Sequence, residues 1–188
     1  MRKNLPVTQL ETIVPTGVFI YSRTDLKGLI TEANVAFAEI SGYTPAEMVG
    51  EPHNLIRHPD MPPEAFADMW TQLKAGRPWK GIVKNRRKDG GFYWVEANVS
   101  PVRENGKIIG YQSVRSRPSP GQIAAASTAY AHVLAGDKSI RIENGRVFKN
   151  HSELVETLLS FEFRLTAFAI LGLLTALVNA HMPVGRPP

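Results

Sequence analysis

The chain has no cysteine among its 188 residues. This absence excludes structural disulfides, iron–sulfur ligation and a thiol nucleophile. An apolar run is also missing after the start, Met-Arg-Lys-Asn-Leu-Pro, so the sequence shows no cleaved secretory signal. We therefore expect the N-terminal part of the chain to stay in the cytoplasm.

The apolar segment 165–178 is short for a membrane span. Its 14 residues rise only about 21 Å as a helix, against ~30 Å of hydrocarbon in a bilayer. A membrane contact and a buried or dimer-forming helix therefore stay open as alternatives. If the segment inserts, the basic residues before it favour a cytoplasmic N-terminal side. These residues are Arg141, Arg146, Lys149 and Arg164.

Composition and charge are those of an ordinary globular protein, with 43% hydrophobic residues, 21% charged residues and a net charge of +5. The length suits one domain and an appendage. Lysine and arginine are scattered except in the run 84–88, Lys-Asn-Arg-Arg-Lys, which is more typical of a solvated strand end than of a binding patch. We expect no nucleic-acid partner.

Turn signals and hydrophobic periodicity predict an α+β domain. Asn34 stands at the N-cap of a helix that Gly42 would end, and Thr44 with Glu47 forms a capping box for the next helix. The expected strands are 18–22, 29–33, 79–87, 92–102 and 108–115, and the expected helices are 35–40, 45–49 and 62–75. This order predicts a five-stranded antiparallel sheet with small helices on one face.

Residues 53–62, His-Asn-Leu-Ile-Arg-His-Pro-Asp-Met-Pro, form an unusually polar loop between apolar elements. A plain structural loop does not require two histidines, an arginine and an aspartate. Trp70, Trp79 and Asn85 follow it, and we interpret the set as one wall of a pocket for a large, planar, phosphate-bearing cofactor. A metal site is not expected, because no third soft ligand stands at a suitable spacing.

Strand alternation assigns several side chains to faces of the sheet. Trp79 and Asn85 share the inward face, whereas Tyr93 points to the core side and Trp94 away from it. A buried amide without partners costs about 1–3 kcal/mol, so Asn85 needs either a backbone partner or the polar edge of a heterocyclic ligand. Asn34 poses the same choice, although its capping role alone would account for it.

Several motifs together resemble a PAS domain, in particular the FAD-binding PAS domain of bacterial aerotaxis (energy-taxis) receptors. The resemblance covers residues 8–117 and implies the PAS fold, with a helical and apolar segment after it. The motifs are residues 34–44 with Ser-Gly-Tyr-Thr, Pro52-His-Asn-Leu-Ile-Arg-His-Pro-Asp-Met-Pro, Phe66-Ala-Asp-Met-Trp, and Trp79-Lys-Gly-Ile-Val-Lys-Asn-Arg-Arg-Lys-Asp-Gly.

The resemblance implies a noncovalently held FAD whose redox state reports respiratory electron flow. Arg57, His58 and Asp60 match positions that this family needs for FAD binding. The planar guanidinium of Arg57 suits a phosphate, whereas Asp60 has the wrong sign and would orient Arg57 or His58, or cap the helix from Pro62. The other expected cofactor-binding residues are Asn85, Trp79, Asn34, His53, Trp70, Tyr93 and Phe66, with Trp79 preferred as the neighbour of the isoalloxazine ring. The missing cysteine excludes a cysteinyl-adduct photocycle.

The expected organisation is an N-terminal cap, a sensor domain, a linking segment, an apolar helix and a tail. Their bounds are 1–17, 18–117, 118–163, 164–180 and 181–188, and within the later segments we expect a helix at 123–134, a turned segment at 140–147 and a helix at 151–160. Related receptors continue into a membrane anchor and a signalling module. A truncated receptor and a sensor that works through a partner therefore both stay open.

The preferred function is a cytoplasmic FAD sensor of redox or energy state in aerotaxis-type signal transduction. No recognisable motif assembles a nucleophile, an oriented base and an oxyanion site, so we do not expect an enzyme. The alternative is a cofactor-free PAS module for protein–protein interaction or dimerisation; a flavin enzyme comes third. Expected partners are the flavin, a second copy of the chain and a downstream chemotaxis signalling module or receptor, with inner-membrane anchoring through 165–178 as an open alternative.

Overall fold

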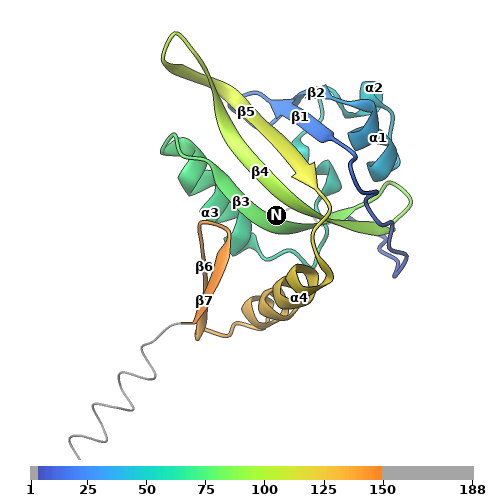
Figure 1. The fold of residues 1–188 in the computed structure, drawn as a ribbon, viewed down its shortest axis with the longest axis vertical. Coiled ribbons are helices and arrows are strands. Elements are labelled where there is room, and N and C mark those ends of the chain that lie inside the picture. Colours follow the sequence, from blue (N-terminus) through green and yellow to red (C-terminus); the bar gives the residue numbers. More distant parts are fainter. Residues whose placement is uncertain (1–3, 150–188) are drawn as a thin grey trace, which may run out of the picture. The chain divides into compact units, whose positions relative to one another are not determined.

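The computed structural model describes residues 4–149. Its centre is a five-stranded antiparallel sheet with the strand order β2-β1-β5-β4-β3 (Figure 1). The strands are β1 (Ile20–Thr24), β2 (Ile30–Ala33), β3 (Trp79–Arg86), β4 (Phe92–Glu104) and β5 (Lys107–Ser116). The predicted PAS-type sheet is therefore confirmed.

Four short helices connect β2 to β3 and pack on the inner face of the sheet. They are α1 (Val35–Ser41), α2 (Pro45–Met48), the 3-10 helix η1 (His53–Ile56) and α3 (Pro63–Lys74). After the sheet come α4 (Pro120–Leu134) and a hairpin of β6 (Ile140–Glu143) and β7 (Arg146–Lys149). The predicted turn of that hairpin is present, because Asn144 and Gly145 have φ values of 49° and 70°.

Helix ends follow the predicted capping residues. The Asn34 side chain accepts a hydrogen bond from the Phe37 amide, and Gly42 ends α1 in the left-handed conformation with a φ of 76°. Thr44 and Glu47 form both bonds of the capping box on α2. The prediction for the next helix was wrong in detail, because α3 begins at Pro63 and no side chain caps it. Asp60 therefore does not serve as its cap.

The core lies between the sheet and the helices on its inner face. Tyr93 and Val95 are fully buried on this face, together with Phe37 of α1. Trp94, on the opposite face, is buried as well, in the same cluster as residues of α4. Tyr130 of α4 anchors this helix there by donating a hydrogen bond to the Ile82 carbonyl over 2.6 Å. Both faces of β3 and β4 thus carry packed side chains.

The N-terminal segment before β1 packs against the start of β4 and the polar loop. The amides of Thr8 and Thr12 donate to the carbonyls of Gly90 and Phe92. The Asn4 side chain donates to the carbonyls of Asn54 and Arg57, at 2.8 and 3.0 Å. This segment therefore ties the polar loop to the sheet.

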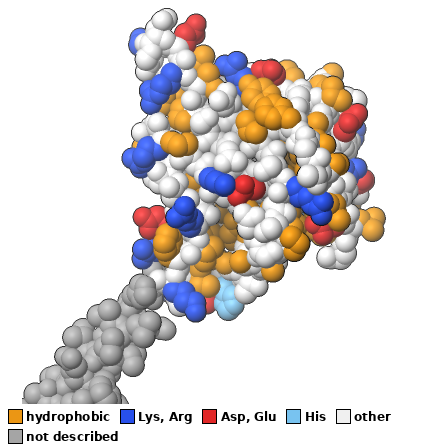
Figure 2. All heavy atoms as spheres, in the orientation of Figure 1, with side chains coloured by type: hydrophobic (Ala, Val, Ile, Leu, Met, Phe, Trp, Pro, Cys, Tyr) orange, Lys and Arg blue, Asp and Glu red, His pale blue; other side chains and the backbone are white. Residues whose placement is uncertain are grey.

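Basic side chains are dispersed over the face shown in Figure 2, with acidic ones among them. Between residues 4 and 149, no helix is long and apolar enough to cross a membrane. The helix expected at 151–160, the apolar segment 164–180 with its run 165–178, and the tail 181–188 lie outside the described residues.

Candidate ligand-binding site

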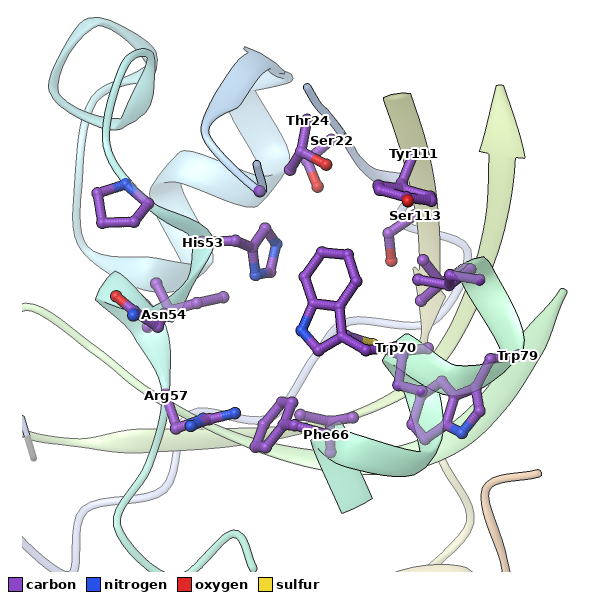
Figure 3. A pocket seen from close by; sticks show the side chains of 18 of the residues that line it. Ser22, Thr24, His53, Asn54, Arg57, Phe66, Trp70, Trp79, Tyr111 and Ser113 are labelled. Carbon is purple, nitrogen blue, oxygen red and sulfur yellow. The ribbon is translucent and has the colours of Figure 1, made fainter. Parts of the chain in front are cut away.

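A cavity of about 380 Å³ lies between the sheet and the helices η1 and α3 (Figure 3). Its size falls at the lower end of the range for small-molecule sites, about 300–1,000 Å³. Three cationic side chains, Lys27, Arg57 and Arg115, line it, and no aspartate or glutamate of the described part of the chain does. The cavity therefore suits a ligand that carries or gains negative charge.

Six of the residues proposed from the sequence lie in the cavity wall. They come from three separate stretches of chain: the polar loop, α3 and β3. These residues are His53, Arg57, Phe66, Trp70, Trp79 and Asn85. Strands β1 and β5 add polar and aromatic side chains to the wall, among them Ser22, Tyr111, Ser113 and Arg115. The fold thus brings the loop and the two elements after it to one space, as the interpretation of the polar loop requires.

Arg57 closes one side of this wall. Its guanidinium carbon lies 3.5 Å from the centre of the Phe66 ring (Figure 3), which is a cation–π contact. The backbone of Arg57 forms a bridge to Asn85 of β3. Burial lowers the pKa of the Arg57 guanidinium, and its Nε atom is buried without a hydrogen-bond partner. A ligand acceptor at Nε would satisfy it.

Asn85 faces the cavity from the end of β3, as strand alternation predicts. It is 4% exposed, and its Nδ2 atom has no partner. No backbone group of the described residues accepts a hydrogen bond from this nitrogen. The purely structural role that a backbone partner would have given Asn85 is therefore not found for Nδ2. An unpaired buried amide is costly, so a ligand acceptor is the physical account that the geometry favours.

The cavity also contains a buried cluster of Arg115, His53 and Ser22. Arg115 Nη2 donates to Ser22 Oγ over 3.0 Å and to His53 Nε2 over 2.7 Å. Nε2 must therefore accept, which places the proton of the neutral imidazole on Nδ1. Arg115 is 3% exposed and stacks on the Phe37 ring at 4.4 Å. Its Nη1 atom has no partner.

The pKa values of this cluster follow from its enclosure and its positive charge. Desolvation lowers the pKa of His53 to about 3, and the charge of Arg115 acts in the same direction. Desolvation also lowers the pKa of Arg115, to about 10, against an opposing effect of Tyr93. At neutral pH the cluster is therefore a charged guanidinium beside a neutral imidazole.

Sequence analysis missed Arg115 and Ser113. Both lie on the inner face of β5, and Ser113 Oγ is another buried atom without a partner. The signal was available, because Tyr111, Ser113 and Arg115 alternate along the predicted strand and so share one face. The alternation that placed side chains on β3 and β4 would have found them on β5.

Trp70 projects from α3 into the middle of the cavity (Figure 3). Its ring meets Tyr111 edge-on, with ring centroids 5.3 Å apart. Across the cavity, its six-membered ring lies close to Gly28, where an added Cβ would be 3.5 Å from it. A planar ligand would therefore have Trp70 as a direct neighbour, as proposed for an aromatic wall.

Four proposed site residues do not line the cavity, and two of them have complete structural roles. Asn34 Oδ1 accepts from the amides of Phe37 and Tyr21, and its Nδ2 donates to the Phe19 carbonyl. Tyr93 shares a 2.7 Å hydrogen bond between its hydroxyl and Ser41 Oγ. Desolvation raises the pKa of Tyr93 to about 12. The structure therefore places both side chains in contacts outside the cavity wall.

His58 and Asp60 lie on the far side of the loop, against Lys84. His58 is buried edge-on against Phe92, and its Nδ1 accepts from the Asp60 amide over 3.2 Å. Desolvation, then the charge of Lys84, lower the pKa of His58 to about 4. The exposed Asp60 carboxylate pairs with Lys84 at 2.7 Å and lies 3.5 Å from His58. Both residues brace the loop and do not contact the cavity.

Unpaired polar atoms make the cavity the candidate binding site. Five buried side-chain nitrogen or oxygen atoms in residues 4–149 lack a partner, and four of them belong to lining residues. Those four are Arg57 Nε, Asn85 Nδ2, Ser113 Oγ and Arg115 Nη1. Native interiors rarely leave such atoms unpaired, and three of the four can only donate. The described residues hold no cluster of three or more histidine, cysteine or acidic side chains for a metal.

Comparison with known proteins agrees with this geometry. The family model described as the PAS fold matches residues 30–115. The aerotaxis receptor of Escherichia coli K12 is 51% identical over 143 residues, which is 76% of this chain and 28% of the receptor. The nitrogen fixation regulatory protein of Klebsiella pneumoniae is 34% identical over 91 residues, covering 48% of this chain and 18% of that protein.

A light–oxygen–voltage domain of known structure shares the fold. It has a TM-score of 0.50 at 22% identity, with 64% of this chain and 87% of that chain covered. The chain therefore carries a PAS domain. This PAS domain belongs to the aerotaxis receptor family. The chain spans less than a third of the length of the Escherichia coli receptor and less than a fifth of that of the Klebsiella protein.

Proposed function

We propose that this PAS domain binds FAD noncovalently in the cavity and senses redox or energy state for an aerotaxis-type signalling pathway. The observation that carries the proposal is the set of unpaired polar atoms at Arg57, Asn85, Ser113 and Arg115. The pyrimidine edge of an isoalloxazine ring presents two carbonyl oxygens and N1, which accept hydrogen bonds, and an N3–H group, which donates one. Three of the four unpaired atoms in the wall are donors only, and Ser113 Oγ can also accept. The aromatic side chains of Trp70 and Trp79 supply the apolar surface that the ring needs.

Arg57 is the residue proposed for the phosphates of the cofactor. Its guanidinium carbon lies 3.5 Å from the centre of the Phe66 ring, and its side chain lines the cavity. Guanidinium groups recognise phosphate with two parallel hydrogen bonds, which an ammonium group does not reproduce. The N-terminal segment supports this position, because Asn4 holds the carbonyl of Arg57 itself.

Sensing would use the Arg115–His53 pair. A bound flavin supplies reversible electron transfer, and the negative charge it gains on reduction is stabilised by a nearby cation. Arg115 provides that charge, and within residues 4–149 no carboxylate lines the cavity to neutralise it. The guanidinium already divides its donors between Ser22 and His53, so attraction toward the ring would weaken one of these bonds and change the packing of β1 or η1.

The place of the chain in the cell is part of the same proposal. We propose a cytoplasmic sensor domain, a homodimer and output through a chemotaxis signalling module; the similarity to the aerotaxis receptor, of which this chain covers 28%, supports this proposal. The anchoring of the apolar run 165–178 in the inner membrane is likewise proposed. All of these features concern the larger assembly rather than the cavity.

The test is the identity of the bound chromophore. Purified protein should be yellow, its absorption should bleach on reduction, and denaturation should release FAD. Release of FMN would overturn the choice of FAD, and a folded, colourless protein that takes up no flavin would overturn the function in favour of a cofactor-free interaction module. Arg57→Ala should lower FAD retention at least tenfold, whereas Arg117→Ala, at an exposed arginine just after β5, should leave it unchanged.

A further inference from the structure

Asp68, on α3 outside the cavity, connects the cavity wall to the hairpin that follows α4. The indole Nε1 of Trp79 donates to Asp68 Oδ2 over 2.7 Å. From the other side, the amides of Asn144 and Gly145 donate to Oδ1 and Oδ2, each over 2.8 Å. One carboxylate therefore accepts three hydrogen bonds from two parts of the chain that are 65 residues apart or more.

The hairpin turn is shaped for this contact. Asn144 and Gly145 both have positive φ, at 49° and 70°. Two consecutive amides in such a turn point the same way and form a small anion-binding concavity. A Cβ at Gly145 would collide with the carbonyl oxygen of Lys80, which is the residue after Trp79. The turn therefore sits directly on the start of β3, and Figure 1 shows the hairpin beside α3.

The Trp79 side chain contacts both the cavity and Asp68. Its ring lines the cavity, and its N–H is fixed by Asp68 outside the cavity. Any movement of the ring changes the position of the carboxylate that also holds the hairpin. The hairpin follows α4 and is the last element of the described residues, so its docking could report the state of the cavity.

We infer that Asp68 is a positioning residue that couples Trp79 in the cavity wall to the docking of the β6–β7 hairpin. A ligand or a redox change that moves Trp79 alters the hold on the Asn144–Gly145 turn. This inference rests on the proposed function only for the identity of the ligand, since the contact itself is independent of what the cavity holds.

Asp68→Asn tests the contact with almost no change in volume. An asparagine offers one acceptor oxygen and an amide group that donates, so it cannot accept from all three donors. Gly145→Ala breaks the same docking from the hairpin side, through the Lys80 carbonyl and the positive φ. Glu64→Gln is the matched control, because Glu64 is an exposed carboxylate in the first turn of the same helix.

The readout is amide hydrogen exchange in the full chain. Exchange at Asn144 and Gly145 should be at least tenfold faster in Asp68→Asn and Gly145→Ala than in the wild type, and unchanged in Glu64→Gln. Trp79→Phe, which removes the indole donor, should speed exchange at the same two amides severalfold. Rates within twofold of the wild type in Asp68→Asn would overturn the docking role, and unchanged rates in Trp79→Phe would overturn the coupling.

A second measurement separates this inference from the proposed function. In FAD-loaded protein, the exchange rates of Asn144 and Gly145 should differ between the oxidised and reduced states, and the difference should vanish in Asp68→Asn. Equal rates in both states, in a protein that bleaches normally, would overturn the coupling while the flavin site stands. A protein that takes up no flavin would overturn the proposed function, and exchange in the Asp68 and Gly145 variants would still decide the role of Asp68.

Discussion

Arg115 donates a hydrogen bond to Nε2 of His53 across 2.7 Å, at the wall of a cavity that no acidic side chain of the described residues lines. The pair joins β5, which lies between β1 and β4 in the sheet, to the 3-10 helix η1 at the start of the polar loop. A buried guanidinium without a carboxylate partner is costly, so its retention needs an explanation. A ligand that gains negative charge provides one.

Replacing Arg115 should shift the reduction potential of the bound flavin. Arg115→Gln removes the positive charge that stabilises the reduced cofactor, so the midpoint potential should fall by several tens of millivolts. Arg115→Lys keeps the charge and should fall less, although it loses the fork that reaches both Ser22 and His53. Spectroelectrochemical titration measures both values. Equal midpoint potentials in Arg115→Gln and the wild type would mean that the Arg115 charge lies too far from the flavin ring to stabilise its reduced state.

Stability should decrease in mild acid because two histidines are held neutral. The folded pKa values of His53 and His58 lie at about 3 and about 4, below the ordinary value of 6.5. Below pH 6.5 the unfolded chain binds protons that the folded chain does not, so stability is complete above that pH and decreases toward pH 4. The slope reaches about 1.4 kcal/mol per pH unit for each histidine.

Urea unfolding at a series of pH values measures this dependence. Between pH 6.5 and 4, the free energy of unfolding of His53→Gln should depend less steeply on pH than that of the wild type. The difference in slope should correspond to about one proton. His132→Gln is the control, because His132 lies on α4 with its side chain half-exposed, paired with Asp137. A slope in His53→Gln equal to that of the wild type would show that His53 titrates normally in the folded protein.

Substitution of Tyr93 tests whether its hydroxyl stabilises the core or binds the ligand. Tyr93→Phe leaves the ring in place and removes the hydroxyl that pairs with Ser41 at a fully buried position. We expect the free energy of unfolding to fall by about 1–3 kcal/mol, while FAD retention stays within twofold of the wild type. Thermal or urea unfolding and flavin-to-protein ratio measure the two effects. Loss of flavin without loss of stability would return Tyr93 to the binding site.

Asn4 should contribute to flavin retention from outside the cavity. Asn4→Ala leaves the carbonyls of Asn54 and Arg57 without their donor, which loosens the loop that positions the Arg57 guanidinium. FAD should dissociate severalfold faster, and dilution of the holoprotein followed by flavin fluorescence measures that rate. Thr8→Ala is the control, since Thr8 holds Gly90 through its backbone amide and this bond survives the substitution. An unchanged rate in Asn4→Ala would limit the N-terminal segment to a packing role.

Local patterns predicted the elements and six of the residues that line the cavity. The caps at Asn34 and Thr44 and the turn at Asn144 are set by short-range hydrogen bonding, which sequence reveals directly. Strand alternation placed Trp79 and Asn85 on the inner face, because the side-chain period of a strand is fixed by its geometry. The extent of the strands was less accurate: β1 begins at Ile20 rather than at residue 18.

The other four proposed residues do not line the cavity, and spacing alone does not tell which side of a loop a side chain takes. His58 and Asp60 follow Arg57 closely, yet they turn to Lys84 and Phe92 on the other side of β3. Arg115 and Ser113 come from the end of the sensor domain and reach the cavity because β5 lies between β1 and β4. Strand alternation shows that Ser113 and Arg115 share one face of β5, but the order of the strands is a long-range property that no local pattern contains.

The sequence by itself determined the fold class, the capped helices and the polar loop that faces β3, since these depend on residue types and periodicity over a few turns of chain. Only the tertiary structure decided which polar groups share the cavity and which donors stay unpaired. It also brought the Asp68 carboxylate between Trp79 and the Asn144–Gly145 turn. Such groups meet because separate elements pack against one another, and their desolvation there is what makes each unpaired donor informative.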